Sequence, residues 1–111
     1  MIIIKNNLDL QYDIIYSKEY IDELTLLYQY IAIHLNEENV AKKLITRIKS
    51  EIINLRYFPK RNKLISKNKK EKLYRCIVKK KYVIIYKVDE KLKKTYILHI
   101  FNSKQNYLKF I

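Results

Sequence analysis

The chain has 111 residues, 49% of them apolar, with 24 Lys or Arg against 11 Asp or Glu and a net charge of +13. This length and composition predict a single folded domain over residues 1–111 and exclude a disordered chain, while the short apolar runs exclude a membrane span. Cys76 is the single cysteine, so an internal disulfide is impossible. Because the start of the sequence lacks a long apolar leader, we expect a cytoplasmic protein.

The positive charge lies almost entirely in the second half of the chain. Residues 1–59 contain 7 basic and 8 acidic residues, whereas residues 60–111 contain 17 and 3. The densest stretch is 60–81, in which Glu71 is the one acid. Like charges packed together repel and lower stability, so this asymmetry indicates a polyanionic partner, for which phosphate is the usual chemistry.

The first half predicts a strand followed by two helices. Apolar and polar residues alternate over 8–16, which is typical of a half-buried strand. Ser17 is then expected to cap a helix over 18–35. Asn36 is expected to break that helix and to cap a second one over about 37–57, which Pro59 ends. The short connection between the helices predicts an antiparallel hairpin.

Apolar residues at steps of three and four mark the buried face of each helix. In the first helix the predicted face is Ile21, Leu24, Leu27, Tyr28, Ile31 and Leu35. In the second helix it is Val40, Ala41, Leu44, Ile45, Ile48, Ile52 and Leu55.

Three further strands are predicted after a polar loop, over about 72–78, 82–88 and 95–101. Since the chain has no glycine, the turns at 79–81 and 89–93 are expected to be loops of three or more residues. The tail, 102–111, is compatible with a strand, a turn of helix or neither. The predicted class is α+β in the order β-α-α-β-β-β, with the helical hairpin packed on one face of a mostly antiparallel four-stranded sheet. The other face is expected to be more open and to carry the basic loop.

The stretch from Leu73 to Asp89, LYRCIVKKKYVIIYKVD, resembles the central hairpin of the RelE/ParE superfamily. An aromatic–Arg pair opens one strand there, and a Tyr-x-x-x-Tyr strand returns beside it. YDIIYS at 12–17 resembles the first strand and helix cap of the superfamily, and ILHIFNSKQNY at 97–107 resembles its last strand and basic tail. The resemblance extends over roughly 8–108.

The resemblance implies the toxin of a type II toxin–antitoxin system, held inactive by a cognate antitoxin with an acidic, partly disordered segment. RelE-like members cleave mRNA on the ribosome, and ParE-like members inhibit DNA gyrase without nuclease activity. Both targets stay open at this point, as does a non-toxic nucleic-acid-binding module. The mRNA-cleaving toxin is the first expectation.

RNA cleavage of this kind uses the 2′-hydroxyl of the RNA and requires no metal or other cofactor, only groups that hold the phosphate and move protons. Arg75 is the first candidate to bind the phosphate through its planar guanidinium. His99 is a candidate general acid, and Tyr107 a candidate for stacking on a base. Lys104 stands in the tail where many members of the superfamily carry Arg. The candidate catalytic set is therefore Arg75, His99, Lys104 and Tyr107.

The basic residues of the second half form the candidate RNA-binding set: Lys60, Arg61, Lys63, Lys67, Lys69, Lys70, Lys72, Lys79, Lys80 and Lys81. Lys67, Lys69, Lys70 and Lys72 are also candidate general bases, provided that neighbouring positive charges lower the pKa of one of them. Structural roles compete with each assignment. Arg75 would then pair with an acid, His99 would pack in a strand, and the lysines would be solvated.

Overall fold

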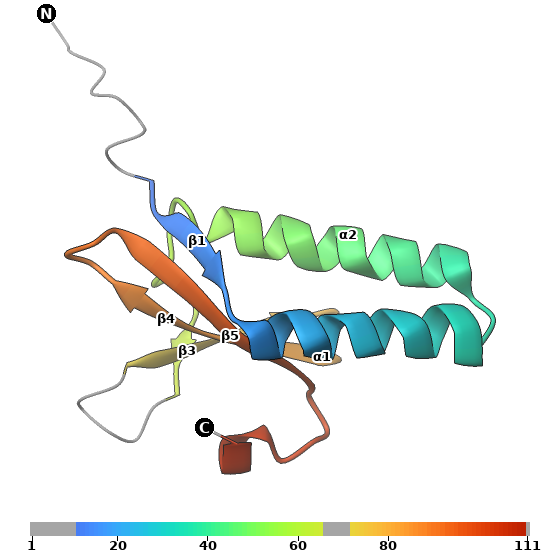
Figure 1. Cartoon of the computed structure of the whole chain (residues 1–111). Helices are drawn as coiled ribbons and strands as arrows, with labels where there is room; N and C mark the ends of the chain where they lie inside the picture. The colour runs from blue at the N-terminus through green and yellow to red at the C-terminus, as the bar shows by residue number, and fades with distance from the viewer. Residues whose placement is uncertain (1–10, 66–71, 111) are drawn as a thin grey trace, which may run out of the picture.

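The computed structural model describes residues 11–65 and 72–110 (Figure 1). Lys67, Lys69 and Lys70 lie outside this part of the chain, as do residues 8–10 of the predicted first strand. The elements in chain order are β1 (Asp13–Tyr16), α1 (Lys18–Gln29), a π-helical turn η2 (Tyr30–His34), α2 (Glu38–Asn54), β2 (Lys63–Leu64), β3 (Leu73–Val78), β4 (Tyr82–Asp89), β5 (Lys94–Asn102) and a 3-10 helix η3 (Tyr107–Phe110).

The fold is α+β, as the sequence predicts, with two helices packed against a mostly antiparallel sheet. The strand order is β1-β5-β4-β3-β2, and β1 pairs with β5 in parallel while the other neighbours are antiparallel. The sheet has five strands instead of the predicted four. The added strand, β2, comes from the polar loop, because Lys63 and Leu64 pair with Arg75 and Tyr74 of β3.

The helical hairpin differs from the prediction at its tip. Ser17 caps α1 as expected, since its Oγ accepts a hydrogen bond from the backbone N–H of Tyr20 at 3.0 Å. The predicted cap of the second helix is wrong. Asn36 has φ of 52° and ends the first helix in the left-handed conformation that glycine usually supplies. Glu37 is the N-cap of α2, and its side chain makes no capping bond.

The buried faces of the two helices also differ from the predicted ones. Tyr20 is buried, whereas the predicted face residues Ile21, Leu35 and Val40 are exposed. Ile21 directly follows buried Tyr20 and is therefore turned about 100° away from it around the helix axis, whereas Leu35 lies after the last turn of the first helix. The second helix ends at Asn54, earlier than Pro59 alone indicates, and a turn follows it.

The core has two parts, one on each face of the sheet, with β4 in the middle of both. Tyr82, Ile84 and Tyr86 point toward the helices, and Val83 and Ile85 point to the opposite face. All five are buried, as expected of a continuous apolar run in a strand covered on both faces. The second face is therefore less open than predicted. Its centre forms a small cluster that consists of Val83, Ile85 and Phe101, with Ile65 and Tyr107 packed against it.

The β3–β4 loop has three residues, Lys79 to Lys81, which agrees with the predicted length. Lys79 and Lys80 nevertheless adopt φ of 54° and 57°, the left-handed region that costs a residue with a Cβ atom about 1–2 kcal/mol. Ser103 holds this loop from the tail, since its N–H donates to the Lys81 carbonyl at 2.7 Å and its Oγ to the Lys80 carbonyl at 3.2 Å.

Candidate functional site

Register across the sheet places three basic residues in one row on the face opposite the helices. Lys63 on β2 lies opposite Arg75 on β3, Arg75 opposite Ile85 on β4, and Ile85 opposite His99 on β5. Directly opposed residues share a face of the sheet, and neighbouring strands are about 4.8 Å apart. Arg75 and His99 are thus two strands apart, roughly 10 Å between their Cα atoms, with fully buried Ile85 between them.

Arg75 is engaged by the tail. Its Nη1 donates a hydrogen bond to the Tyr107 hydroxyl at 3.0 Å. The ring of Tyr107 stacks on Phe101, with 6.5 Å between centroids, and Phe101 stacks on His99 at 4.9 Å. The structure therefore brings together three of the four candidate catalytic residues, Arg75, His99 and Tyr107, around Phe101.

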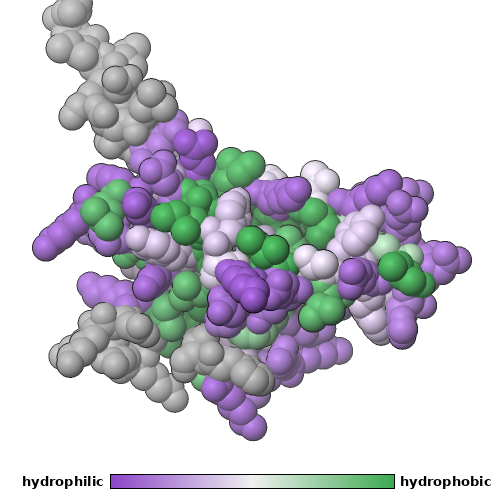
Figure 2. Space-filling model, viewed as in Figure 1, coloured by the Kyte–Doolittle hydropathy of each residue, from purple (hydrophilic) through white to green (hydrophobic). Residues whose placement is uncertain are grey.

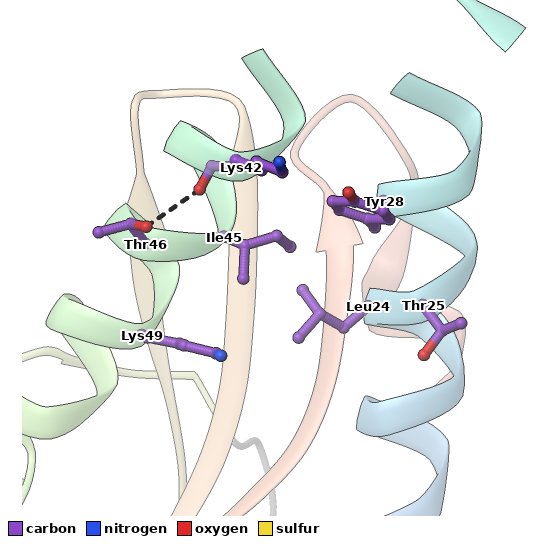
Figure 3. A pocket seen from close by; sticks show the side chains of 7 residues that line it. All are labelled: Leu24, Thr25, Tyr28, Lys42, Ile45, Thr46 and Lys49. Atoms are coloured by element: carbon purple, nitrogen blue, oxygen red, sulfur yellow. Dashed lines mark hydrogen bonds between the residues drawn. The ribbon is translucent and has the colours of Figure 1, made fainter. Parts of the chain in front are cut away.

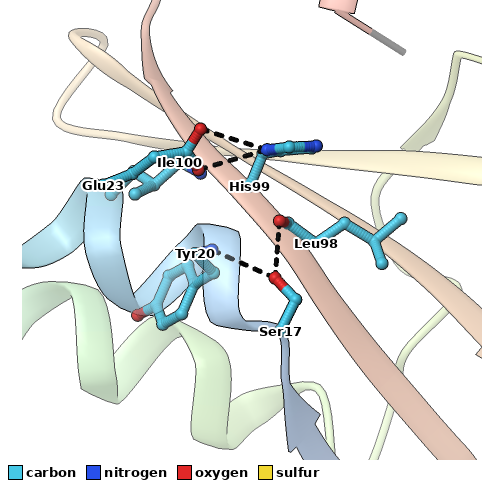
Figure 4. A network of polar contacts seen from close by, with 6 residues as sticks. All are labelled: Ser17, Tyr20, Glu23, Leu98, His99 and Ile100. Atoms are coloured by element: carbon cyan, nitrogen blue, oxygen red, sulfur yellow. Dashed lines mark hydrogen bonds and ion pairs between the residues drawn. The ribbon is translucent and has the colours of Figure 1, made fainter.

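His99 contacts a carboxylate that the sequence did not point out. Its Nδ1 lies 3.1 Å from Oε2 and 3.2 Å from Oε1 of Glu23 on α1 (Figure 4). Glu23 Oε1 also accepts the backbone N–H of Ile100 at 3.0 Å. A few residues earlier, Ser17 Oγ donates to the Leu98 carbonyl at 2.7 Å. Side chains at the start of α1 thus form hydrogen bonds with backbone groups of β5 in the part of the strand that extends beyond its pairing with β1.

The contact with Glu23 determines which ring nitrogen of His99 carries a proton. An ionised carboxylate only accepts hydrogen bonds, so Nδ1 must be the donor. In the neutral ring Nε2 then keeps a free lone pair. Figure 4 shows this second nitrogen on the side of the ring away from Glu23. The arrangement resembles a carboxylate-oriented histidine, although the stack on Phe101 covers one ring face.

Sequence patterns gave a partial signal for Glu23 and Phe101. Glu23 lies three residues after buried Tyr20 and four before half-buried Leu27, so helical spacing places it on the side of α1 that faces the sheet. Phe101 lies two residues after His99 on β5 and therefore shares its face. Only the tertiary fold shows that both meet His99.

The basic candidates among the described residues do not form one patch. Lys79, Lys80 and Lys81 lie at the start of β4, and the Ser103 contacts bring exposed Lys104 to the same end. Lys60 and Arg61 lie at the other end, where Lys60 forms an ion pair with Glu90 after β4. The eight residues of β4 separate the two ends by about 25 Å. Lys63 lies in the row beside Arg75, and Lys72 is exposed just before β3.

Cys76 is buried on the helix-facing side of β3. Burial, with a smaller contribution from the charge of Glu51, raises the pKa of its thiol to about 11. The thiol therefore stays protonated at neutral pH and is a poor nucleophile.

Two cavities lie away from the row. One is a groove of about 520 Å³ between α1 and α2, lined by Leu24, Thr25, Tyr28, Lys42, Ile45, Thr46 and Lys49 (Figure 3). Figure 2 shows hydrophobic side chains among hydrophilic ones on the face that the helices form. The other cavity, of about 580 Å³, lies where α2 ends and is lined by Tyr12, Tyr57, Phe58, Pro59, Lys60, Arg61 and Glu90.

Comparison with known families gives a match over most of the described residues. Residues 14–107 match the sequence model of the family described as the ParE toxin of the type II toxin–antitoxin system parDE. The match extends over most of the chain. The chain belongs to the ParE toxin family. As a ParE-family toxin, the protein has a cognate antitoxin as its partner.

A solved structure supports the fold of this ParE-family chain. A chain of the chromosomal ParDE toxin–antitoxin system from P. aeruginosa superimposes with a TM-score of 0.68 at 14% sequence identity, over 83% of this chain and 96% of that one. No curated protein matches the sequence. Within residues 11–65 and 72–110, no helix is long and apolar enough to cross a membrane, and no cluster of three His, Cys, Asp or Glu residues is placed to hold a metal.

Proposed function

We propose that this ParE-family toxin arrests growth by binding DNA gyrase and not by cutting mRNA. The proposal rests on the family and on the state of the residues in the row. Arg75 is bonded to Tyr107, and His99 is held by Glu23 and stacked on Phe101. Both side chains thus have partners within the fold. A tail fixed on this face in one position favours recognition of another protein over catalysis.

The packing at the centre of the row also favours gyrase binding over RNA cleavage. A nuclease site needs room for a phosphate between the group that binds it and the group that moves the proton. Here Ile85 lies between Arg75 and His99 and is fully buried under Phe101 and Tyr107.

The groove between the helices fits the antitoxin. Its floor is apolar, from Leu24, Tyr28 and Ile45, and Lys42 and Lys49 lie along the α2 side (Figure 3). An amphipathic acidic segment would bury its apolar side chains there and place carboxylates beside Lys49 and beside Lys42, whose ammonium is also paired with exposed Glu38 at 3.2 Å. We assign this groove to the antitoxin because the charges are complementary. Replacing Ile45 with Asp, next to the lysines, should weaken toxin–antitoxin binding, whereas Lys43→Ala, also on α2 but outside the groove, should not.

The target is tested by inducing the toxin in bacteria and following two responses in parallel. A gyrase inhibitor should switch on a DNA-damage reporter while incorporation of labelled methionine continues through the first minutes. An mRNA-cleaving toxin should stop incorporation first. Arg47 is a surface arginine on α2 that pairs with Glu51. Arg47→Ala is the control variant and should give the same responses as the wild type. Early loss of protein synthesis without the reporter would overturn the gyrase proposal.

One observation favours mRNA cleavage as the second candidate. Glu23 orients His99 so that Nε2 has a free lone pair, and Arg75 lies in the same row at about 10 Å. If the tail moved aside, His99 could accept the 2′-hydroxyl proton while Arg75 bound the phosphate. Primer extension on mRNA in a purified translation system tests this. Cuts that need His99 and Arg75 would support the second candidate.

A further inference from the structure

The cavity at the end of α2 combines exposed aromatic rings with positive charge. Phe58 is 69% exposed and Tyr57 is 48% exposed, and both line the cavity together with Tyr12. Lys60 and Arg61 follow directly in the chain, and the Lys93 ammonium lies 4.9 Å from the centroid of the Tyr12 ring. Single exposed apolar residues are common on protein surfaces, whereas several aromatic rings gathered in one cavity are typical of a binding site.

The backbone that presents these rings is held firmly. Tyr12 N–H donates to the Arg56 carbonyl at 2.8 Å. The hydroxyl of buried Tyr86 donates to the Pro59 carbonyl at 2.6 Å and accepts a bond from Asn62 at 3.0 Å. The segment from 57 to 61 is thus fixed on both sides while its aromatic side chains face solvent. Figure 1 shows the elements that meet here: the start of β1, the end of α2 and the β4–β5 turn.

The local charge favours an anion. The cavity and its rim contain three cationic side chains and one carboxylate. The cations are Lys60, Arg61 and Lys93, and the carboxylate is Glu90, which pairs with Lys60. Arg61 is exposed and is left to bind a phosphate with its planar fork. The cavity, at about 580 Å³, is in the size range of roughly 300–1,000 Å³ typical of small-ligand sites.

From this geometry we infer a second binding site, in which one base of a single-stranded nucleic acid stacks on Phe58 and Tyr57 while its phosphate binds Arg61. Stacking on an aromatic ring with a neighbouring cation is the general mode of binding single strands, and it tolerates any base. The site is separate from the row of Lys63, Arg75 and His99, and it does not depend on gyrase being the target. The experiment below compares an RNA strand with a DNA strand and so determines which of the two nucleic acids binds.

The test measures fluorescence anisotropy of the full-length toxin with labelled 12-nucleotide strands, U12 as RNA and T12 as DNA, at fixed salt. Phe58→Ala should weaken binding about tenfold, because the stacking of one base on the ring is lost. Tyr30→Ala, another exposed tyrosine at the far tip of the hairpin, should leave binding unchanged. Arg61→Ala should also lower the slope of affinity against salt by about 0.7. Equal affinity for U12 and T12 would mean stacking without sugar recognition, and a preference would name the source.

Three results would overturn the inference. The first is no saturable binding of either strand. The second is an equal effect of Phe58→Ala and Tyr30→Ala. The third is competition by polyglutamate of matched charge as effective as that by unlabelled U12, since this would leave charge alone as the cause. None of these results bears on gyrase, because the measurement uses the toxin without it.

Discussion

Arg75 on β3 and Tyr107 in η3 are joined by a hydrogen bond of 3.0 Å, across 32 residues of sequence. This bond fixes the tail on the face of the sheet opposite the helices and covers the cluster around Ile85. It also explains why a basic row that looks exposed in the sequence is half covered in the fold.

Removing the Tyr107 hydroxyl tests that role. Tyr107→Phe keeps the stack on Phe101 and deletes the bond to Arg75, so the free energy of unfolding should fall by about 1 kcal/mol. Tyr107→Ala should cost more, because the ring contact is lost as well. Urea denaturation followed by circular dichroism measures both. Equal stability of Tyr107→Phe and the wild type would mean that the tail is not held by this bond.

The sequence predicted the two helices and four of the strands in their correct order, but it did not indicate β2 or the row that Lys63, Arg75 and His99 form. The strands and helices follow from local periodicity, which is why their ranges agree with the structure to within a few residues. The contacts of His99 with Glu23 and of Arg75 with Tyr107 join residues 76 and 32 positions apart. No local pattern encodes such pairs. Ile21 and Leu35 were wrongly placed in the core because steps of three and four give neither the exact direction of the buried face, which contains Tyr20 instead of Ile21, nor its end before Leu35.

His99 should carry its proton on Nδ1, since Glu23 can only accept. Nitrogen-15 NMR of the two histidines distinguishes the tautomers, and exposed His34 serves as the internal reference. Glu23→Gln should allow His99 to sample both tautomers and should lower stability by about 1 kcal/mol or more, because a hydrogen bond to a charged group is lost. An Nε2–H tautomer in the wild type would contradict the geometry.

Substitutions in the β3–β4 loop should stabilise the protein. Lys79 and Lys80 hold positive φ angles, which Asn and Gly adopt at lower cost. The double change Lys79→Asn with Lys80→Gly should raise stability by about 1–2 kcal/mol, visible as a higher melting temperature. Lys91→Gly, in the β4–β5 turn but not at a positive φ, is the control and should be neutral or destabilising. Loss of stability in the double variant would mean that the turn is not strained.

Stability should fall in alkaline solution, and the direction follows from two buried acids. Burial raises the pKa of Cys76 from 9.0 to about 11 and that of Tyr86 from 10.0 to about 12. Each group ionises more easily in the unfolded chain, so its contribution is complete below the unfolded pKa and is lost as pH rises toward the folded pKa. The free energy of unfolding should therefore decline from pH 9 upward.

Cys76→Ala separates the thiol from the buried tyrosines. It should flatten the decline between pH 9 and 10, where only the thiol of the unfolded chain ionises, and leave the decline above pH 10 that Tyr86 causes together with Tyr20, whose pKa is also raised by burial. Urea midpoints at half-unit steps of pH measure this. An unchanged profile in Cys76→Ala would show that the thiol is not protected by burial.

Inhibition of gyrase by the toxin can be measured with purified gyrase, relaxed plasmid and ATP. We expect wild-type toxin to stop supercoiling in a dose-dependent way, its antitoxin to restore supercoiling, and Arg47→Ala to behave as wild type. Normal supercoiling at a large excess of toxin, with mRNA cut by the same preparation in a translation mixture, would contradict this expectation.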